Sequence, residues 1–140
     1  TAITLSNPKA DTLLAALPSE LRSVLRLWTR WVDAVGNTSN VEANIKPTVD
    51  AITLLAEFEV FGSRSYANQY EKNHQAQMAY YSAGNGKVHY KYNDTSSSVD
   101  WWMCSPLYYN NQSFCGVYRN GDTMISNGTY SGAIAPAFKT

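Results

Sequence analysis

The stretch Trp101-Trp102-Met103-Cys104 opens the last third of this chain of 140 residues. Its four consecutive apolar side chains predict a short strand. Residues 106–112 are typical of a loop, and residues 113–118 predict a second strand. The dipeptide Asn120-Gly121 then supplies the residue types that most strongly favour a tight hairpin turn. These segments together predict antiparallel strands joined by short connections.

The predicted sheet extends outward from these strands in both directions. Upstream, Ala83-Gly84-Asn85-Gly86 is a turn signal, and the side chains that follow it alternate in polarity. The remaining segments are a strand over 87–92, a serine-rich loop over 93–98, a returning strand over 122–125, a turn at 127–128 and a closing segment over 131–138. We therefore expect a crowded antiparallel meander in the second half of the chain.

The first half of the chain shows a helical repeat instead. Over residues 19–35, apolar side chains recur at the i, i+3, i+4, i+7 spacing of one buried helix face. The members of this face are Leu21, Val24, Leu25, Trp28, Trp31, Val32 and Val35. Gly36 follows directly, as expected where a helix ends. Arg22, Arg26 and Arg30 fall on the opposite face, where we expect solvent.

A strand and a weaker helical segment follow the predicted helix. Over 51–61, apolar side chains alternate with Glu57 and Glu59, which predicts a strand whose carboxylates face the side opposite the apolar residues. Paired carboxylates also occur in acid–base catalysis, but solvent exposure, or pairing with neighbouring Arg or Lys, explains this i, i+2 spacing better. Residues 65–81 are weakly helical. Helices followed by a meander indicate an α+β fold, in a single domain that spans residues 1–140.

The charge composition excludes several classes of protein. Eleven basic and eleven acidic side chains give a formal net charge of zero, and only 16% of the residues are charged. Nucleic-acid binding depends largely on clustered Lys and Arg, so we expect no nucleic-acid partner. No apolar run approaches the roughly 20 residues of a membrane span, so we expect no membrane insertion. The chain begins with Thr1 and no secretory signal, so we expect it to be the C-terminal part of a longer protein.

Groups suited to catalysis or metal binding are scarce in the sequence. His74 and His89 lack the spacing of metal ligands, and no Gly-x-Ser-x-Gly elbow or Gly-rich phosphate loop occurs. We therefore expect no metal, no cofactor and no enzyme activity. Cys104 and Cys115 lie on strands that a hairpin places side by side. They form either a disulfide or two buried thiols that pack as small apolar residues.

Tyrosine is concentrated in the second half of the chain. All ten tyrosines lie from Tyr66 onward, and Asn, Ser and Asp accompany them in the predicted loops. Tyr supplies large, rigid contact area, while Ser, Gly and Asn supply adaptable hydrogen bonds, which is the composition of antibody paratopes. The same composition also fits an ordinary β-surface whose rings cover the core. Composition alone leaves both interpretations open.

Several short motifs in the last third of the chain are specific when taken together. They are Trp101-Trp102-Met103-Cys104-Ser105-Pro106, Phe114-Cys115-Gly116-Val117, Gly121 and Gly132-Ala133-Ile134-Ala135-Pro136-Ala137-Phe138. This order resembles the WW-x-x-SP … F-x-x-V … G … G-V-x-PAF ending of a domain family found in phage tail proteins and bacterial surface proteins. The runs 52–62 and 17–22 are similar to that family's preceding strand and helix start.

The resemblance implies a C-type-lectin-like fold. Some domains of this kind are the variable proteins of diversity-generating retroelements, in which adenine-directed mutagenesis enriches Asn, Tyr, Ser, Asp, Thr and Gly on a fixed scaffold. The resemblance also implies that one of Trp101 and Trp102 lies in the core and the other beneath the binding loops, since neighbours on a strand face opposite sides. Pro136 implies an edge or an irregular ladder, and Phe138 is expected to fill the core.

The chain departs from this family at two points. Cys104 stands where the family usually has Arg. The Glu-Pro-Asn and Trp-Asn-Asp motifs of calcium-dependent lectins are absent, so the resemblance does not imply a calcium-bridged sugar site.

These observations favour a non-enzymatic ligand-binding domain with a variable Tyr/Asn/Ser-rich surface. It would be the tip of a phage tail or of a bacterial surface adhesin, located on the virion tail or cell surface, with a protein or glycan receptor on a host cell. The residues expected to contact the ligand are Tyr92, Asp94, Tyr108, Tyr109, Asn110, Asn111, Tyr118, Arg119, Asp122 and Tyr130. The alternatives are an enzyme similar to the formylglycine-generating enzymes, using Cys104 and Cys115, and an oligomerisation module that forms a homo-oligomer within a fibre.

Overall fold

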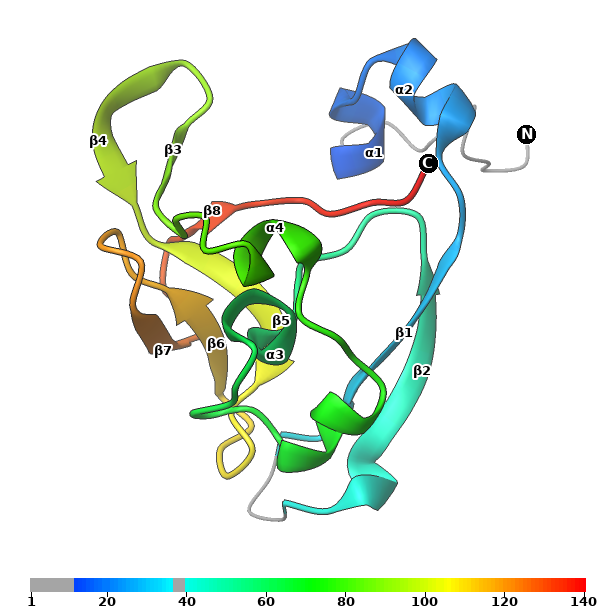
Figure 1. The fold of residues 1–140 in the computed structure, drawn as a ribbon, viewed down its shortest axis with the longest axis vertical. Coiled ribbons are helices and arrows are strands. Elements are labelled where there is room, and N and C mark those ends of the chain that lie inside the picture. Colours follow the sequence, from blue (N-terminus) through cyan, green and yellow to red (C-terminus); the bar gives the residue numbers. More distant parts are fainter. Residues whose placement is uncertain (1–11, 37–39) are drawn as a thin grey trace.

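A computed structural model of the chain describes residues 12–36 and 40–140 (Figure 1). Its helices are α1 (Leu13–Ala16), α2 (Ser19–Val24), α3 (Glu57–Phe61) and α4 (Ala79–Ser82), with the 3₁₀ turns η1 (Glu42–Asn44) and η2 (Gln69–Asn73). None of the helices in these two ranges is long and apolar enough to cross a membrane. Its strands are β1 (Trp28–Asp33), β2 (Ile45–Asp50), β3 (His89–Lys91), β4 (Asp94–Val99), β5 (Trp101–Pro106), β6 (Ser113–Val117), β7 (Thr123–Asn127) and β8 (Ala133–Ile134).

The strands of the described residues form three sheets. β1 pairs with β2, and β3 pairs with β4, each as an antiparallel ribbon. The largest sheet has four strands in the order β7-β6-β5-β8. In Figure 1 the β1–β2 ribbon lies at the right, and α3 and α4 lie over β5 near the centre. Short helices combined with small, mainly antiparallel sheets confirm the predicted α+β class.

The central strands of the last third were predicted correctly. The segment predicted at 101–104 is the start of β5, and the segment predicted at 113–118 is β6. Asn120-Gly121 forms the expected turn between β6 and β7, in which Gly121 adopts a φ of 94°. The main-chain N–H of Tyr118 donates to the carbonyl of Asp122 at 2.8 Å and closes this turn. Glycine meets no steric penalty at this positive φ, which explains why the dipeptide was a reliable signal.

The closing strand β8 differs from the predicted antiparallel meander. It pairs with Trp101 and Trp102 of β5 in the parallel direction, because residues 128–132 first carry the chain back along the sheet. The irregular ladder expected at Pro136 is confirmed, since isolated bridges follow β8 in the described structure. Phe138 is 37% exposed, so its predicted place in the core is wrong. The described segment after β8 pairs only through isolated bridges at Ala137 and Lys139, and it does not form a continuous strand that would pack Phe138 against the core.

The predicted helix over 19–35 is wrong in its second half. Helix α2 ends at Val24, and the chain continues as β1, which pairs antiparallel with β2. The Trp, Thr and Val side chains of β1 fit a pleated strand better than a helix. Arg30 was expected in solvent but is only 3% exposed, because its guanidinium forms an ion pair with Glu59. A buried arginine thus breaks the relation between apolar spacing and burial on which the helix prediction depended.

The predicted strand over 51–61 is helical at its C-terminal end. Helix α3 begins after Ala56, whose N–H donates to Oε2 of Glu59 at 2.8 Å, and ends at Gly62 with a φ of 70°. The expected solvent exposure of these carboxylates is wrong, since Glu57 and Glu59 are 0% and 4% exposed. The alternative of pairing with an arginine is confirmed for Glu59, which forms an ion pair with Arg30. Both carboxylates accept hydrogen bonds from main-chain N–H groups inside the fold. Alternating polarity cannot distinguish such buried carboxylates from exposed ones.

Two further segments differ in part from the predictions. Residues 65–81 were predicted as weakly helical, and they contain η2 and α4 separated by non-helical residues. The serine-rich loop predicted over 93–98 is wrong, since this segment forms strand β4. Lys91 pairs with Asp94 across a two-residue turn, and the ladder with β3 holds β4 in place. A mostly exposed strand of this kind has no apolar face by which sequence could reveal it.

The core lies between the four-stranded sheet and the helical segments that cover it. Its buried members are Val60, Ala67, Tyr81, Trp101, Met103, Cys115 and Val117. Trp101 is 0% exposed, whereas Trp102 lies on the opposite face of β5, edge-on to Phe114 and Tyr130. The prediction that one of the two paired tryptophans is buried in the core is therefore confirmed.

Buried carboxylates hold together the irregular connections around this core. Glu57 accepts a hydrogen bond from the N–H of Ala67 at 2.8 Å. Glu71 accepts one from the N–H of Asp33 at 2.9 Å and another from the hydroxyl of Ser105 at 2.7 Å. These bonds provide partners for main-chain groups that no strand or helix pairs. Burial raises the pKa of Glu71 to about 7, despite the hydrogen bonds that it accepts.

Candidate functional site

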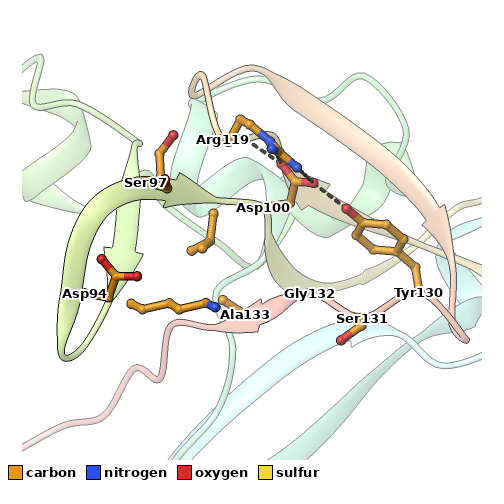
Figure 2. Close-up of a pocket in the computed structure, with 11 residues that line it drawn as sticks. Asp94, Ser97, Asp100, Arg119, Tyr130, Ser131, Gly132 and Ala133 are labelled. Carbon is orange, nitrogen blue, oxygen red and sulfur yellow. Dashed lines mark hydrogen bonds and ion pairs between the residues drawn. The ribbon is translucent and has the colours of Figure 1, made fainter.

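An open cleft lies where the β3–β4 hairpin, the β6–β7 turn and the start of β8 approach one another (Figure 2). Its volume is about 440 Å³, within the range of sites that bind small molecules. The residues lining it include Lys91, Asp94, Ser97, Asp100, Arg119 and Tyr130. Three segments that are distant in the sequence thus contribute polar side chains to one cleft.

Asp100 is the centre of the hydrogen-bond network in this cleft. One carboxylate oxygen accepts from the main-chain N–H of Arg119 at 2.8 Å and from its Nε at 3.3 Å. The other oxygen accepts from Nη2 of Arg119 at 3.4 Å and from the hydroxyl of Tyr130 at 2.5 Å. Figure 2 shows both side chains converging on the carboxylate. The bond from Tyr130, together with those from Arg119, holds the pKa of Asp100 below its ordinary value.

The local fold explains why these three residues meet. Asp100 directly precedes β5, and its carbonyl accepts from the N–H of Ala133 at 2.8 Å, which fixes the start of β8 beside it. Arg119 lies in the turn that Asn120-Gly121 forms between β6 and β7. Tyr130 lies in the segment that carries the chain back from β7 to β8. The sheet therefore positions all three residues before any ligand arrives.

The opposite wall of the cleft comes from the β3–β4 hairpin. Oδ1 of Asp94 accepts from the N–H of Ser96 at 3.0 Å and from its hydroxyl at 2.5 Å. These bonds hold the pKa of Asp94 below its ordinary value, so this carboxylate is ionised at neutral pH. Ser97 and Ser131 add hydroxyl groups on the two sides of the cleft (Figure 2).

A smaller apolar hollow of about 260 Å³ lies on the outer face of β5. Leu54, Trp102, Cys104 and Phe114 contribute to its walls. Trp102 also packs edge-on against Tyr130, whose hydroxyl reaches Asp100. The polar cleft and the apolar hollow are thus connected through one aromatic pair.

The structure brings together only some of the residues predicted to contact a ligand. Asp94, Arg119 and Tyr130 all line the cleft, whereas the exposed Tyr118 and Asp122 share the turn of Arg119 without lining it. Three of the ten predicted contact residues therefore meet at one site.

The other predicted contacts lie elsewhere on the molecule. Tyr92 is fully exposed at the tip of the β3–β4 hairpin. The predicted contacts Tyr108, Tyr109, Asn110 and Asn111 follow the far end of β5, a strand about 20 Å long at roughly 3.3 Å per residue. There Tyr108 and Tyr109 pack edge-on at 4.8 Å between ring centroids, and Arg64 lies over the Tyr108 ring.

The residue on which this site is built, Asp100, was not among those predicted from the sequence. Asp100 is an acidic side chain placed directly before the apolar run of β5, and that position was the one available signal. Lys91, Ser97 and Ser131 were also missed, because their role depends on the unpredicted strand β4 and on the crossing segment before β8.

Most of the chain matches a known protein family. Residues 11–139 match the profile of a family described as a domain of unknown function, DUF6273. The chain belongs to the DUF6273 family. No curated protein and no solved structure matches it significantly. Every residue of the cleft lies within the matched part of this DUF6273 domain.

The two cysteines of the DUF6273 domain are free thiols. Cys115 is 0% exposed and Cys104 is half-buried, so the sequence alternative of two buried thiols fits better than a disulfide. Burial raises the pKa of Cys104 to about 12 and also raises that of Cys115. A thiolate nucleophile is therefore disfavoured at both positions at neutral pH.

The two histidines of the DUF6273 domain pack against aromatic rings. His74 stacks on Trp31 at 4.6 Å, and His89 lies 4.5 Å from Trp101, with Nε2 within 3.4 Å of the Tyr81 hydroxyl. Burial lowers the pKa of His89. Across residues 12–36 and 40–140, no three His, Cys, Asp or Glu side chains form a group that could hold a metal ion.

Proposed function

We propose that this DUF6273 domain is a non-enzymatic ligand-binding domain and that the Asp100 cleft is its binding site. The observation that carries the proposal is the network in which Asp100 holds Arg119 and Tyr130 at an open, polar surface. Binding groups that are ordered in advance lose less conformational entropy when a ligand arrives. The cleft therefore has the preorganisation and the volume expected of a site for a small group on a larger ligand.

The arrangement of loops on the sheet supports the same function. The cleft is built from hairpin turns and a crossing segment, while the buried faces of β5 and β6 supply stability. Loops carried by a rigid scaffold accept substitution more readily than the core does. This division suits a variable receptor-binding domain with a C-type-lectin-like fold, as in phage tail tips or bacterial surface adhesins diversified by a retroelement. The receptor would be a protein or glycan on a host cell.

A formylglycine-type enzyme is the alternative that the cysteines suggest. Such a reaction needs a reactive thiolate, and burial raises the pKa of both Cys104 and Cys115. Neither thiol lines the Asp100 cleft. The geometry of the polar site therefore favours binding over this chemistry.

The proposal is tested by binding to host bacterial cells and to arrays of immobilised glycans and peptides. The test variant combines Arg119→Ala with Tyr130→Phe, and the control is Tyr109→Ala at the other end of β5. We expect the wild type and the control to bind the same targets and the double variant to lose them while keeping its near-UV circular dichroism spectrum. Equal binding by the folded double variant, or loss of binding in the control alone, would contradict the assignment of the cleft.

A further inference from the structure

The hydrogen-bonding groups of the cleft are unevenly used. Asp100 is fully occupied by donors from the protein and Asp94 is occupied in part, whereas the basic side chains keep most of their donors free. A ligand therefore meets a surface rich in donors, although the formal charges of Lys91, Asp94, Asp100 and Arg119 sum to zero.

The carboxylates of Asp94 and Asp100 already accept hydrogen bonds from the protein. Asp100 is 7% exposed and accepts four hydrogen bonds, three from Arg119 and one from Tyr130. Asp94 accepts two hydrogen bonds from Ser96. A carboxylate offers about four lone-pair positions, so Asp100 has no capacity left for a ligand.

Arg119 keeps several of its hydrogen-bond donors free. A guanidinium carries five N–H donors, and the Nε–H and one Nη2–H point toward Asp100. Apart from an interaction with the Tyr130 hydroxyl, the remaining guanidinium hydrogens make no hydrogen bond with the described residues, and the side chain is 68% exposed. One Nη1–H and the free Nη2–H form the parallel fork that matches the two oxygens of a carboxylate.

Lys91 and the serines supply the remaining contacts. The ammonium of Lys91, which lines the same cleft, makes no hydrogen bond with the described part of the chain. Ser97 and Ser131 likewise present hydroxyl groups without protein partners in the described structure. Hydroxyl-lined surfaces of this kind suit a ring that carries several hydroxyl groups.

We propose that the cleft binds an acidic sugar unit through a single carboxylate. The free Nη1–Nη2 edge of Arg119 holds the carboxylate, Lys91 adds a second positive charge, and the serine hydroxyls contact the ring. A polyanion is disfavoured because Asp94 and Asp100 lie beside the two basic groups. This inference rests on the proposed binding function and names the class of ligand.

The test is a titration of the ¹⁵N-labelled protein followed by two-dimensional NMR. The probes are glucuronate, glucuronamide as the matched neutral sugar, and an acetylated dipeptide with a free C-terminal carboxylate. We expect millimolar glucuronate to shift the amide signals of Ser97, Arg119 and Gly132, with glucuronamide binding about tenfold more weakly, since charge-assisted hydrogen bonds are roughly twice as strong as neutral ones. The variant Arg119→Gln should bind both sugars equally weakly, and Arg26→Gln, outside the cleft, should behave as the wild type.

Several results would overturn the inference. The wild type could bind glucuronate and glucuronamide with equal affinity, bind no glucuronate, or prefer the dipeptide. The Arg119→Gln variant, with a well-dispersed spectrum that shows it to be folded, could bind glucuronate as tightly as the wild type. Failure of the inference and failure of the proposed function are distinguishable. If array ligands that contain no acidic sugar bind in the cleft, the inference fails and the proposed binding function is kept. If the wild-type domain binds no array target, both the inference and the proposed function are contradicted.

Discussion

The hydroxyl of Tyr130 donates a hydrogen bond to Oδ2 of Asp100 over 2.5 Å, although thirty positions separate the two residues in the chain. Arg119, which lies between them in the sequence, donates to both oxygens of the same carboxylate from its other side (Figure 2). One buried acid at the start of β5 thus fixes two loops that end at opposite edges of the cleft. The site depends on this carboxylate remaining ionised, because a protonated acid accepts hydrogen bonds less well.

Replacing Tyr130 by Phe removes this donor and keeps the ring against Trp102. Since the Tyr130 bond is the largest cause of the lowered pKa, we expect the pKa of Asp100 to rise toward its ordinary value of 3.8. A lowered carboxyl pKa stabilises the fold above the unfolded pKa, and this stabilisation is lost as pH falls through the folded pKa. The variant should therefore be less stable than the wild type at neutral pH and approach it in acid.

The measurement is an NMR pH titration of the Asp100 carboxyl carbon, combined with thermal unfolding at several pH values. Tyr118→Phe is the matched control, because Tyr118 lies in the adjacent turn and its hydroxyl has no partner among the described residues. An unchanged pKa of Asp100 in Tyr130→Phe would show that the hydrogen bond does not form in solution.

Local signals predicted the parts of the fold that depend on local chemistry. The turn at Asn120-Gly121 and the strands on either side of it were found because a left-handed glycine and an apolar run have short-range causes. Strand β1 and helix α3 were assigned incorrectly because buried charges, Arg30 and Glu59, occupy positions that the pattern assigned to the polar side of each segment. A pairwise contact across twenty-nine positions cannot be inferred from spacing along one segment.

The candidate site was predictable to a similar extent. Arg119 and Tyr130 were predicted as ligand contacts because their residue types are common at binding surfaces, and both line the cleft. Asp100 was missed, because its role comes from the parallel addition of β8 and from the crossing segment that delivers Tyr130. The loop at 108–111 has the same composition but lies at the other end of β5, so composition could not separate the two surfaces.

The buried ion pair between Arg30 and Glu59 gives a prediction of stability. The two side chains are 3% and 5% exposed, and Arg30 also packs over Trp28 at 4.2 Å. Arg30→Met leaves the carboxylate of Glu59 buried without its cation, so we expect a loss of about 3 kcal/mol in the free energy of unfolding. Chemical denaturation measures this loss, and Arg26→Met at an exposed position should change stability by less than about 0.5 kcal/mol.

A double variant separates the ion pair from the packing of Arg30. Glu59→Gln keeps an oxygen that can accept from the N–H of Ala56 while removing the charge. If the pair is coupled as the geometry indicates, the double variant should lose less stability than the sum of the two single variants. Strict additivity would show that the two charges do not interact in the folded protein.

The buried carboxyl group of Glu71 predicts a dependence of stability on pH. Burial raises its pKa from 4.5 to about 7, so between these values the folded protein holds a proton that the unfolded chain has released. Its contribution is therefore fully present below pH 4.5 and declines as pH rises toward 7, with a slope of up to about 1.4 kcal/mol per pH unit. Glu71→Gln should flatten this part of the profile relative to the wild type.

Urea denaturation between pH 4 and 8 provides the comparison for Glu71. Gln keeps an acceptor for the N–H of Asp33, so the variant retains the shape of the side chain without the titration. The exposed Glu42, changed to Gln, serves as control and should leave the pH dependence unaltered. An equal slope in Glu71→Gln and the wild type would show that Glu71 titrates normally in the fold.

The thiols of Cys104 and Cys115 should react slowly in the native protein. Burial raises the pKa of both groups, so few thiolates exist at neutral pH, and Cys115 is also shielded completely from solvent. We expect slow labelling by iodoacetamide in buffer and rapid labelling of both thiols in denaturant, as measured by mass spectrometry. Fast native labelling of either residue would favour the enzyme alternative over the binding function. Absence of labelling in denaturant would instead indicate a disulfide and contradict the free thiols of the structure.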